Sequence, residues 1–249
     1  MSLGIIIQAR LGSTRLPGKI LLPFYGGQTI IDILLEKVHR VTEIPVIIAT
    51  TNDTSNDLMV THLHTRGELV FRGSENDVLD RFIQAAEQHH LDGIIRICSD
   101  NPFIDPEGIQ KLIEKAQNSE AQYVGFRING KPSIKTHFGF WGEYVTLNAL
   151  KKVAASTNDQ PAHEHVTIYI YSHPEEYPCE WIECPDFIQG RNDIRLTVDT
   201  QEDFANAQMV YASLRNSHPD FGLKEVVDYI DQHEELKSSM KRIIEQNAK

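Results

Sequence analysis

The chain has 249 residues, of which 41% are hydrophobic and 24% are charged, a length and composition that fit one large α/β domain or two small ones. Its formal net charge of −11 argues against nucleic acid as a partner, because nucleic-acid-binding faces are normally basic. No apolar run approaches the roughly 18 residues of a membrane span, and three cysteines without a C-x-x-C pair argue against a disulfide framework, so we expect a cytoplasmic protein without a membrane partner.

Strand-like and helix-like segments alternate through the first half of the chain. Short apolar runs predict buried strands, and apolar residues that repeat with helical spacing predict helices. Thr29 and Asp32 form a capping-box pair at one helix start, and Ser74 and Asp77 precede another. In chain order we predict a strand over 4–9, a helix from 29, a strand over 45–50, a helix over 57–66, a strand over 68–71, a helix after 77, a strand over 93–98, a helix over 106–117 and a strand over 121–126.

The second half is less regular. We predict helices over 143–155, 161–171, 201–214 and 223–233, strands over 180–184 and 194–198, and a charged helix at the C-terminus. Strands that alternate with helices predict an α/β fold with a mostly parallel sheet covered on both faces. Ligands of such sheets bind beyond the carboxyl ends of the strands, which makes the loops over 10–19, 51–57 and 99–105 candidate binding loops.

Three cations lie in the acid-free loop after the first predicted strand, namely Arg10, Arg15 and Lys19. Gly12 and Gly18 allow the backbone to approach a ligand closely. Guanidinium groups hold phosphate oxygens bidentately, and a lysine ammonium stabilises negative charge that develops on a leaving group. The loop therefore predicts a triphosphate site, although a basic surface loop is the alternative.

This loop is not a P-loop. That motif needs four residues between its glycines and a hydroxyl residue after the lysine. Here five residues separate Gly12 from Gly18, and Ile20 follows Lys19. A kinase or ATPase built on the P-loop is therefore disfavoured.

The segment Gln-Ala-Arg-Leu-Gly-Ser-Thr-Arg-Leu-Pro-Gly-Lys at 8–19 resembles the N-terminal signature of cytidylyltransferases that activate keto-sugar acids, such as acylneuraminate and 3-deoxy-manno-octulosonate cytidylyltransferases. It is most similar to the branch named for the spore coat polysaccharide biosynthesis protein SpsF. The segments 72–79, 96–106 and 195–203 also resemble that branch. The resemblance implies a glycosyltransferase-A-like three-layer sandwich and a homodimer. It further implies transfer of CMP from CTP to an acidic sugar in surface polysaccharide biosynthesis.

The resemblance also implies roles for particular residues. Arg15 and Lys19 would be catalytic, and Asp100 and Asp199 would hold Mg²⁺, although either aspartate could instead cap a loop or helix. The other expected nucleotide-binding residues are Ala9, Arg10, Gly12, Ser13, Arg72, Ser74 and Arg96; for Arg72 a surface position is equally expected, and Ser74 is first a helix cap.

A second acid-free window over 121–142 carries Arg127, Lys131, Lys135 and His137. We expect Arg127 and Lys135 to bind an anionic acceptor sugar, because a guanidinium fork suits a carboxylate. Solvation of a surface loop is the alternative. His163 stands where the related branch has an arginine in Arg-Glu-His-Val-Thr and is a third acceptor candidate. We treat 1–249 as one nucleotidyltransferase domain with an irregular insertion at about 127–190 for acceptor binding or dimerisation.

Two other functions remain open from the sequence. A glycosyltransferase or another nucleotide-sugar enzyme of the same fold is one, although the chain lacks the Asp-x-Asp metal motif that such transferases often use. A nucleotide-binding module without catalysis is the other, and the presence of Lys19, Asp100 and Asp199 argues against it.

Overall fold

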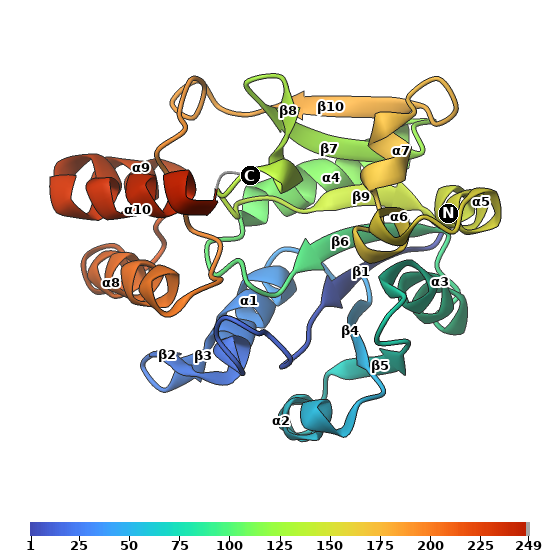
Figure 1. Cartoon of the computed structure of the whole chain (residues 1–249), viewed down its shortest axis with the longest axis horizontal. Helices are drawn as coiled ribbons and strands as arrows, with labels where there is room; N and C mark the ends of the chain where they lie inside the picture. The colour runs from blue at the N-terminus through green and yellow to red at the C-terminus, as the bar shows by residue number, and fades with distance from the viewer. Residues whose placement is uncertain (248–249) are drawn as a thin grey trace.

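An eight-stranded sheet forms the centre of the computed structural model, which describes residues 1–247 (Figure 1). The strand order is β10-β7-β9-β6-β1-β4-β5, and the short β8 pairs with β7. The strands are β1 (Leu3–Gln8), β4 (Val46–Thr51), β5 (Leu69–Gly73), β6 (Gly93–Cys98), β7 (Tyr123–Ile128), β8 (Lys131–Pro132), β9 (Glu143–Thr146) and β10 (Cys179–Glu183). A separate hairpin joins β2 (Pro23–Tyr25) to β3 (Gln28–Thr29).

The predicted parallel sheet is confirmed for its first half and interrupted in its second. Strand β1 lies between β4 and β6 and is parallel to both, and β4 is parallel to β5. Strand β9 lies between β6 and β7 and is antiparallel to both. The carboxyl ends of β1, β4 and β6 therefore open onto the same edge of the sheet.

Helices cover both faces of this sheet, as the alternation of elements predicts. Ile5 and Ile7 of β1 pack into one apolar cluster with helices α1, α4 and α8, and Ile6 packs into another with α3, α5 and α6. Successive side chains of a strand point to opposite faces, so three neighbouring isoleucines serve two cores. The helices are α1 (Ile30–His39), α2 (Asp57–Thr65), α3 (Val78–Gln88), α4 (Pro106–Asn118), α5 (Leu147–Ser156), α6 (Gln160–Glu164), α7 (Ile168–Ser172), α8 (Gln201–Ser217), α9 (Leu223–Gln232) and α10 (Glu234–Asn247).

Three predictions for the second half are wrong in part. The helix expected over 143–155 begins only at Leu147, because 143–146 form β9. The helix expected over 161–171 is broken into α6 and α7, with Val166 between them at a φ of 54°. Residues 194–198 form no strand; the amide of Leu196 donates to His137 O, and that of Val198 donates to Asp100 O.

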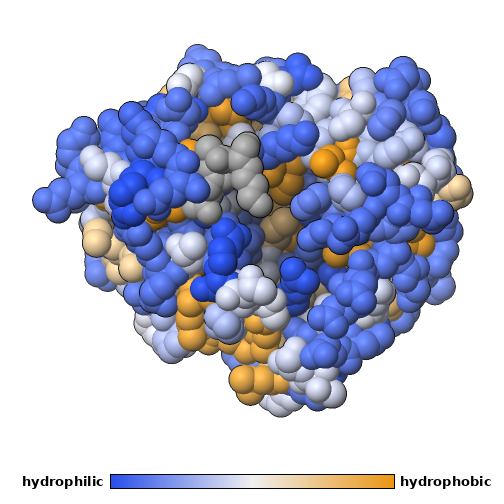
Figure 2. All heavy atoms as spheres, in the orientation of Figure 1, coloured by the Kyte–Doolittle hydropathy of each residue, from blue (hydrophilic) through white to orange (hydrophobic). Residues whose placement is uncertain are grey.

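The face of the molecule seen in Figure 2 is largely hydrophilic and is hollowed near its centre. Within the described part of the chain, no helix is long and apolar enough to cross a bilayer.

Candidate functional site

A cavity of about 250 Å³ lies where β1 and β6 end. The loop that follows β1 forms one wall, the start of the loop that follows β6 forms another, and Asp199 closes the site. The lining residues are Gln8, Arg10, Gly12, Ser13, Thr14, Arg15, Lys19, Cys98, Ser99, Asp100 and Asp199. Segments far apart in the sequence therefore meet at the sheet edge where α/β proteins bind their ligands.

Lys19 bridges the two aspartates of this cavity. Gly18 adopts a left-handed φ of 68°, which residues with a Cβ rarely adopt, and directs the chain into the 3-10 turn Lys19–Leu21. The Lys19 Nζ lies 3.1 Å from Asp100 Oδ2 and 3.3 Å from Asp199 Oδ1, and it also donates to Val198 O. One buried ammonium thus holds two carboxylates from distant loops side by side.

The remaining residues of the predicted phosphate loop are placed differently. Arg15 pairs with Asp199 Oδ1 at 3.0 Å, whereas the exposed Arg10 forms no ion pair with the described residues. The Ser13 Oγ accepts a hydrogen bond from the Leu16 amide. Ala9 is buried and does not line the cavity. The cavity therefore offers one free guanidinium and two cations that are already paired with carboxylates.

Asp100 and Asp199 fit a Mg²⁺ ion by their chemistry. Mg²⁺ is commonly bound through one or two carboxylates and completed by substrate phosphates and water. The two side chains lie within reach of one ammonium group, and both line the cavity that holds the cationic loop. No group of three or more potential metal-binding His, Cys, Asp or Glu side chains occurs within residues 1–247, so a bound ion would depend on a ligand for its other donors.

A second cavity, of about 400 Å³, adjoins the first and shares Cys98, Asp100 and Asp199 with it. Burial raises the pKa of the Cys98 thiol to about 11, so this cysteine is a neutral thiol at pH 7. The second cavity is also lined by Arg96, Asn101, Ser133, Ile134, Lys135, Thr136, His137, Phe138, Gly139, Phe140, Trp141, His165 and Thr197. Two compartments therefore meet at the pair of aspartates.

A buried arginine that the sequence analysis did not single out, Arg195, donates a hydrogen bond to Asp199. Arg195 is only 2% exposed; its Nε lies 2.7 Å from Asp203 Oδ1, and its two terminal nitrogens contact Asp199 and His137. Asp203 also caps helix α8 by accepting from the Thr200 amide. The four-residue steps from 195 to 199 to 203 were the available signal in the sequence.

Arg96 forms its hydrogen bonds with other side chains inside the protein. It is 6% exposed, and its guanidinium donates to Glu143 at 2.7 Å and to the Gln8 side chain at 3.1 Å. Tyr123 donates to the other oxygen of Glu143. Arg96 lines the second cavity but not the first, so it does not border the cavity that holds the predicted phosphate loop.

Arg72 and Ser74 line neither cavity. The guanidinium of Arg72 donates to Asp57 and to the carbonyls of Thr51, Asn52 and Asp53, which fixes the loop after β4. The Ser74 hydroxyl accepts from the Asp77 amide just before α3, in keeping with its interpretation as a cap.

Two of the three expected acceptor residues lie away from the second cavity. Arg127 lies over the Trp181 ring at 4.6 Å and near Glu183. The two ring nitrogens of His163 contact Asp77 and the Thr157 carbonyl. Of the predicted acceptor residues, only Lys135 lines this compartment, where His137 joins it.

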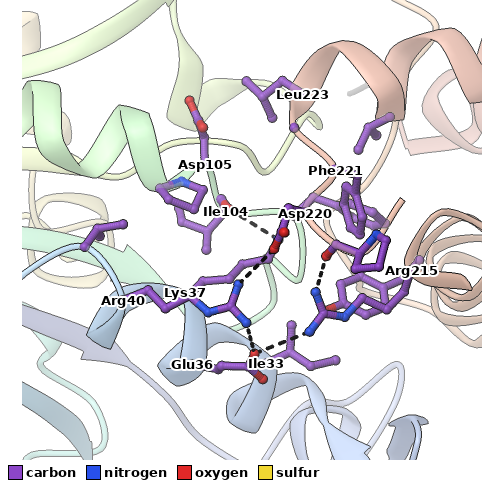
Figure 3. Close-up of a pocket in the computed structure, with 17 residues that line it drawn as sticks. Ile33, Glu36, Lys37, Arg40, Ile104, Asp105, Arg215, Asp220, Phe221 and Leu223 are labelled. Carbon is purple, nitrogen blue, oxygen red and sulfur yellow. Dashed lines mark hydrogen bonds and ion pairs between the residues drawn. The ribbon is translucent and has the colours of Figure 1, made fainter. Parts of the chain in front are cut away.

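A separate cavity of about 240 Å³ lies between α1, α8 and the segment before α9 (Figure 3). Arg40 and Arg215 both pair with Glu36 there. The Lys37 ammonium donates to Pro102 O at 3.0 Å and lies near three aromatic rings; burial lowers its pKa to about 7. The cations of this cavity thus have partners within the described residues, and Lys37 links α1 to the loop after β6.

Comparison with known proteins places this geometry in context. A family model described as cytidylyltransferase matches residues 4–248. The chain is 35% identical over 240 residues to the spore coat polysaccharide biosynthesis protein SpsF of Bacillus subtilis, a match that covers 92% of this chain and 93% of that protein.

Solved structures share the fold. A cytidylyltransferase from Leptospira borgpetersenii superposes with a TM-score of 0.80 at 29% identity, covering 95% of this chain and 96% of that chain. CMP:2-keto-3-deoxy-manno-octonic acid synthetase, solved in complex with CTP, superposes with a TM-score of 0.65 at 16% identity, covering 86% of this chain and 99% of that chain. The predicted three-layer α/β fold with a mostly parallel sheet is confirmed.

Proposed function

Because the chain belongs to the cytidylyltransferase family of enzymes, we propose that it transfers CMP from CTP to an acidic sugar and releases pyrophosphate. The observation that carries the proposal is the pair of adjoining cavities that share Asp100 and Asp199. One compartment has the cations that a triphosphate needs, and the other has the size and polar lining for a sugar. The bond to be formed would lie at their junction.

In this proposal the loop after β1 holds the triphosphate. Arg10 has no carboxylate partner among the described residues and is available to a phosphate oxygen, while Ser13 offers a hydroxyl. Arg15 and Lys19 turn from their aspartates toward the nucleotide as it binds, which stabilises the charge that develops on the leaving pyrophosphate. The sugar hydroxyl attacks the α-phosphorus in line from the second cavity, and positioning by both compartments contributes most of the rate.

Asp100 and Asp199 would hold the divalent ion, which we propose is Mg²⁺. When bound, Mg²⁺ neutralises phosphate charge and helps orient the nucleotide. Before the ligands bind, Lys19 lies between the two carboxylates and Arg195 contacts Asp199, so the protein itself holds the two carboxylates close together.

The acceptor we propose is a keto-sugar acid. The related synthetase of 16% identity is named for 2-keto-3-deoxy-manno-octonic acid and was solved with CTP, and Lys135 supplies a cation in the second cavity here. We further propose that the chain acts in the cytoplasm in surface polysaccharide biosynthesis, as a homodimer of single-domain subunits in which 127–190 carries acceptor or subunit contacts.

Thermal unfolding in the presence of CTP, UTP, GTP, ATP or nucleotide-sugars, with and without Mg²⁺, tests the nucleotide. Saturation at about 100 times Kd stabilises a protein by about 2.7 kcal/mol, so a rise in Tm of several degrees is expected for CTP with Mg²⁺. Pyrophosphate release with 2-keto-3-deoxy-manno-octonate and other sugar acids then tests the acceptor. Preferential stabilisation by nucleotide-sugars would instead favour glycosyl transfer, and binding without release by any acceptor would favour a non-catalytic module.

A further inference from the structure

The hydrogen bonds around His137 determine which of its ring nitrogens carries a proton. The Nδ1 of His137 lies 2.7 Å from a terminal nitrogen of Arg195. A guanidinium has donors only and stays protonated, so it cannot accept a hydrogen bond from the ring. Nδ1 must therefore be the unprotonated acceptor, and the neutral ring carries its hydrogen on Nε2.

The other ring nitrogen of His137 has no partner in the described part of the chain. Nε2 of His137 makes no hydrogen bond to any described residue, and it is not among the buried side-chain atoms without a partner. The half-buried ring lines the cavity that also contains Lys135. Its Nε2–H is thus a free donor on a residue that borders the space in which the acceptor is placed.

We propose that His137 recognises an oxygen of the acceptor sugar as a neutral hydrogen-bond donor, and that Arg195 is the positioning residue that fixes this state. The inference rests on the proposed function and names a contact within it. His137 was counted among the cations of the window over 121–142; here it acts through its dipole and not through a charge. It also cannot serve as the base for the sugar hydroxyl, because its only lone pair points at Arg195.

Burial and the nearby Arg195 charge both lower the pKa of His137 below its ordinary value. The direction agrees with the geometry, since a second ring proton would face a guanidinium. A neutral ring at pH 7 follows from either observation.

The surroundings of His137 indicate what kind of molecule it binds. Lys135 forms no ion pair with a described residue, so its ammonium is available to a carboxylate. Two buried oxygens at the cavity wall, Asn101 Oδ1 and Thr197 Oγ1, have no hydrogen-bond partner within residues 1–247. The second cavity thus combines a cation without a carboxylate partner among the described residues with amide and hydroxyl side chains, a combination that suits a polyhydroxylated acid.

Arg195 joins acceptor recognition to the nucleotide side of the site. The same guanidinium that fixes His137 donates to Asp199 Oδ2 at 3.0 Å and is held by Asp203. A shift of Asp199 when nucleotide binds is therefore transmitted to the ring that faces the sugar. One buried side chain aligns both substrates.

The ring state is tested without any substrate. In nitrogen-15 NMR spectra of histidine-labelled protein at neutral pH, Nδ1 of His137 should resonate as an unprotonated nitrogen and Nε2 as a protonated one. The signals are assigned by their absence from the His137→Gln variant. A protonated Nδ1, or a doubly protonated ring, would overturn the inference.

Steady-state kinetics test the contact with the sugar. His137→Phe should raise the KM for the sugar acid that supports pyrophosphate release, by roughly 10- to 100-fold, the range expected for a hydrogen bond to a charged group, and should leave the KM for CTP within about twofold. His137→Gln, which keeps an amide donor near Nε2, should recover part of the loss. An unchanged sugar KM in His137→Phe would refute the recognition role.

Two controls separate this inference from the proposed function. His64→Phe carries the same substitution at an exposed position of α2 and should leave all constants unchanged. Absence of pyrophosphate release with every sugar acid in the wild-type protein would refute the proposed function and, with it, the sugar contact, while the NMR spectrum alone would still establish the tautomer.

Discussion

Lys19 is the most buried cation of the phosphate loop, and its ammonium is shared between Asp100 and Asp199. Lys19→Ala should slow pyrophosphate release by roughly 10²-fold or more, the scale expected when one donor to the transition state is lost. Arg15→Ala should also slow pyrophosphate release, because it removes a cation that contacts the nucleotide in the proposed function. Lys111→Ala, on the exposed face of α4, is the matched control. Wild-type turnover in both loop variants would mean that the loop does not hold the reacting phosphates.

The two aspartates should be needed for metal-dependent activity. Asp100→Asn and Asp199→Asn each remove a negative charge while keeping the side chain's shape, so each should abolish Mg²⁺-dependent pyrophosphate release. Titration of activity against Mg²⁺, together with circular dichroism to verify the fold, measures the effect. Asp186→Asn at the surface serves as the control. Full activity of either site variant at ordinary Mg²⁺ would exclude that carboxylate from the ion.

The sequence predicted charged residues near the site better than it predicted their partners. The loop over 10–19 lies where its pattern indicated, because a strand followed by glycines and cations constrains its own neighbourhood. Arg72 and Arg96 contact side chains that lie 15 to 88 residues away in the chain, and no local pattern reveals these contacts. The four-residue steps from Arg195 to Asp199 and Asp203 were a local signal, but the contact of Arg195 with His137 spans 58 residues and leaves no local pattern.

At the scale of elements, His163 links the short helix α6 to the start of α3. The Thr157 carbonyl and the Asp77 carboxylate raise the pKa of His163 above its ordinary value of 6.5, because both accept hydrogen bonds from the charged ring. The contribution of His163 to the free energy of unfolding is therefore complete below about pH 6.5. It is lost as the pH rises through the higher pKa of His163 in the folded state.

His163→Gln should remove that pH dependence. We expect the variant to lose about 1 kcal/mol of unfolding free energy below the unfolded-state pKa and progressively less above the folded-state pKa. Urea unfolding of wild type and variant at several pH values measures the difference. His64→Gln changes an exposed side chain that contacts no described residue by hydrogen bond or ion pair, and it should track the wild type. A difference that grows with pH would contradict the assignment.

Elements with a strong local pattern were predicted well, and those defined by tertiary pairing were not. The capping box of Thr29 and Asp32 marks the start of α1, and the pattern at Asp77 precedes α3. By contrast, 143–146 become β9 because both neighbouring strands present free edges to them. The break at Val166 lets the Thr167 hydroxyl donate to Glu143, and the helical spacing of apolar residues does not reveal this contact.

At the scale of the whole molecule, one buried ion pair joins the two halves of the sheet. Arg96 of β6 and Glu143 of β9 are 6% and 1% exposed, and Glu143 also accepts from Tyr123 of β7. Removing one charge from a buried pair typically costs about 3–5 kcal/mol, because the partner is left uncompensated. Glu143→Gln should therefore destabilise the protein by about 3 kcal/mol or more in urea unfolding.

The matched control for this pair lies on the surface. Glu176 pairs with Lys152 at 3.6 Å, and both side chains are more than 40% exposed. Glu176→Gln should change the unfolding free energy by less than about 1 kcal/mol, since exposed pairs contribute little. Equal effects of the two substitutions would mean that the pair between β6 and β9 does not hold the sheet together.

The position of β9 between β6 and β7 also constrains the order in which the protein can assemble as it leaves the ribosome. Strands β4, β5 and β6 can pair as soon as they emerge, because β1 or β4, the neighbour that each needs, has already been synthesised. Strand β7 emerges before β9 and cannot join them until Thr146 has been synthesised. At about 5–20 residues per second, the edges of β6 and β7 that β9 will occupy are both unpaired for about 1–4 s, an interval in which chaperones or a neighbouring nascent chain can reach them.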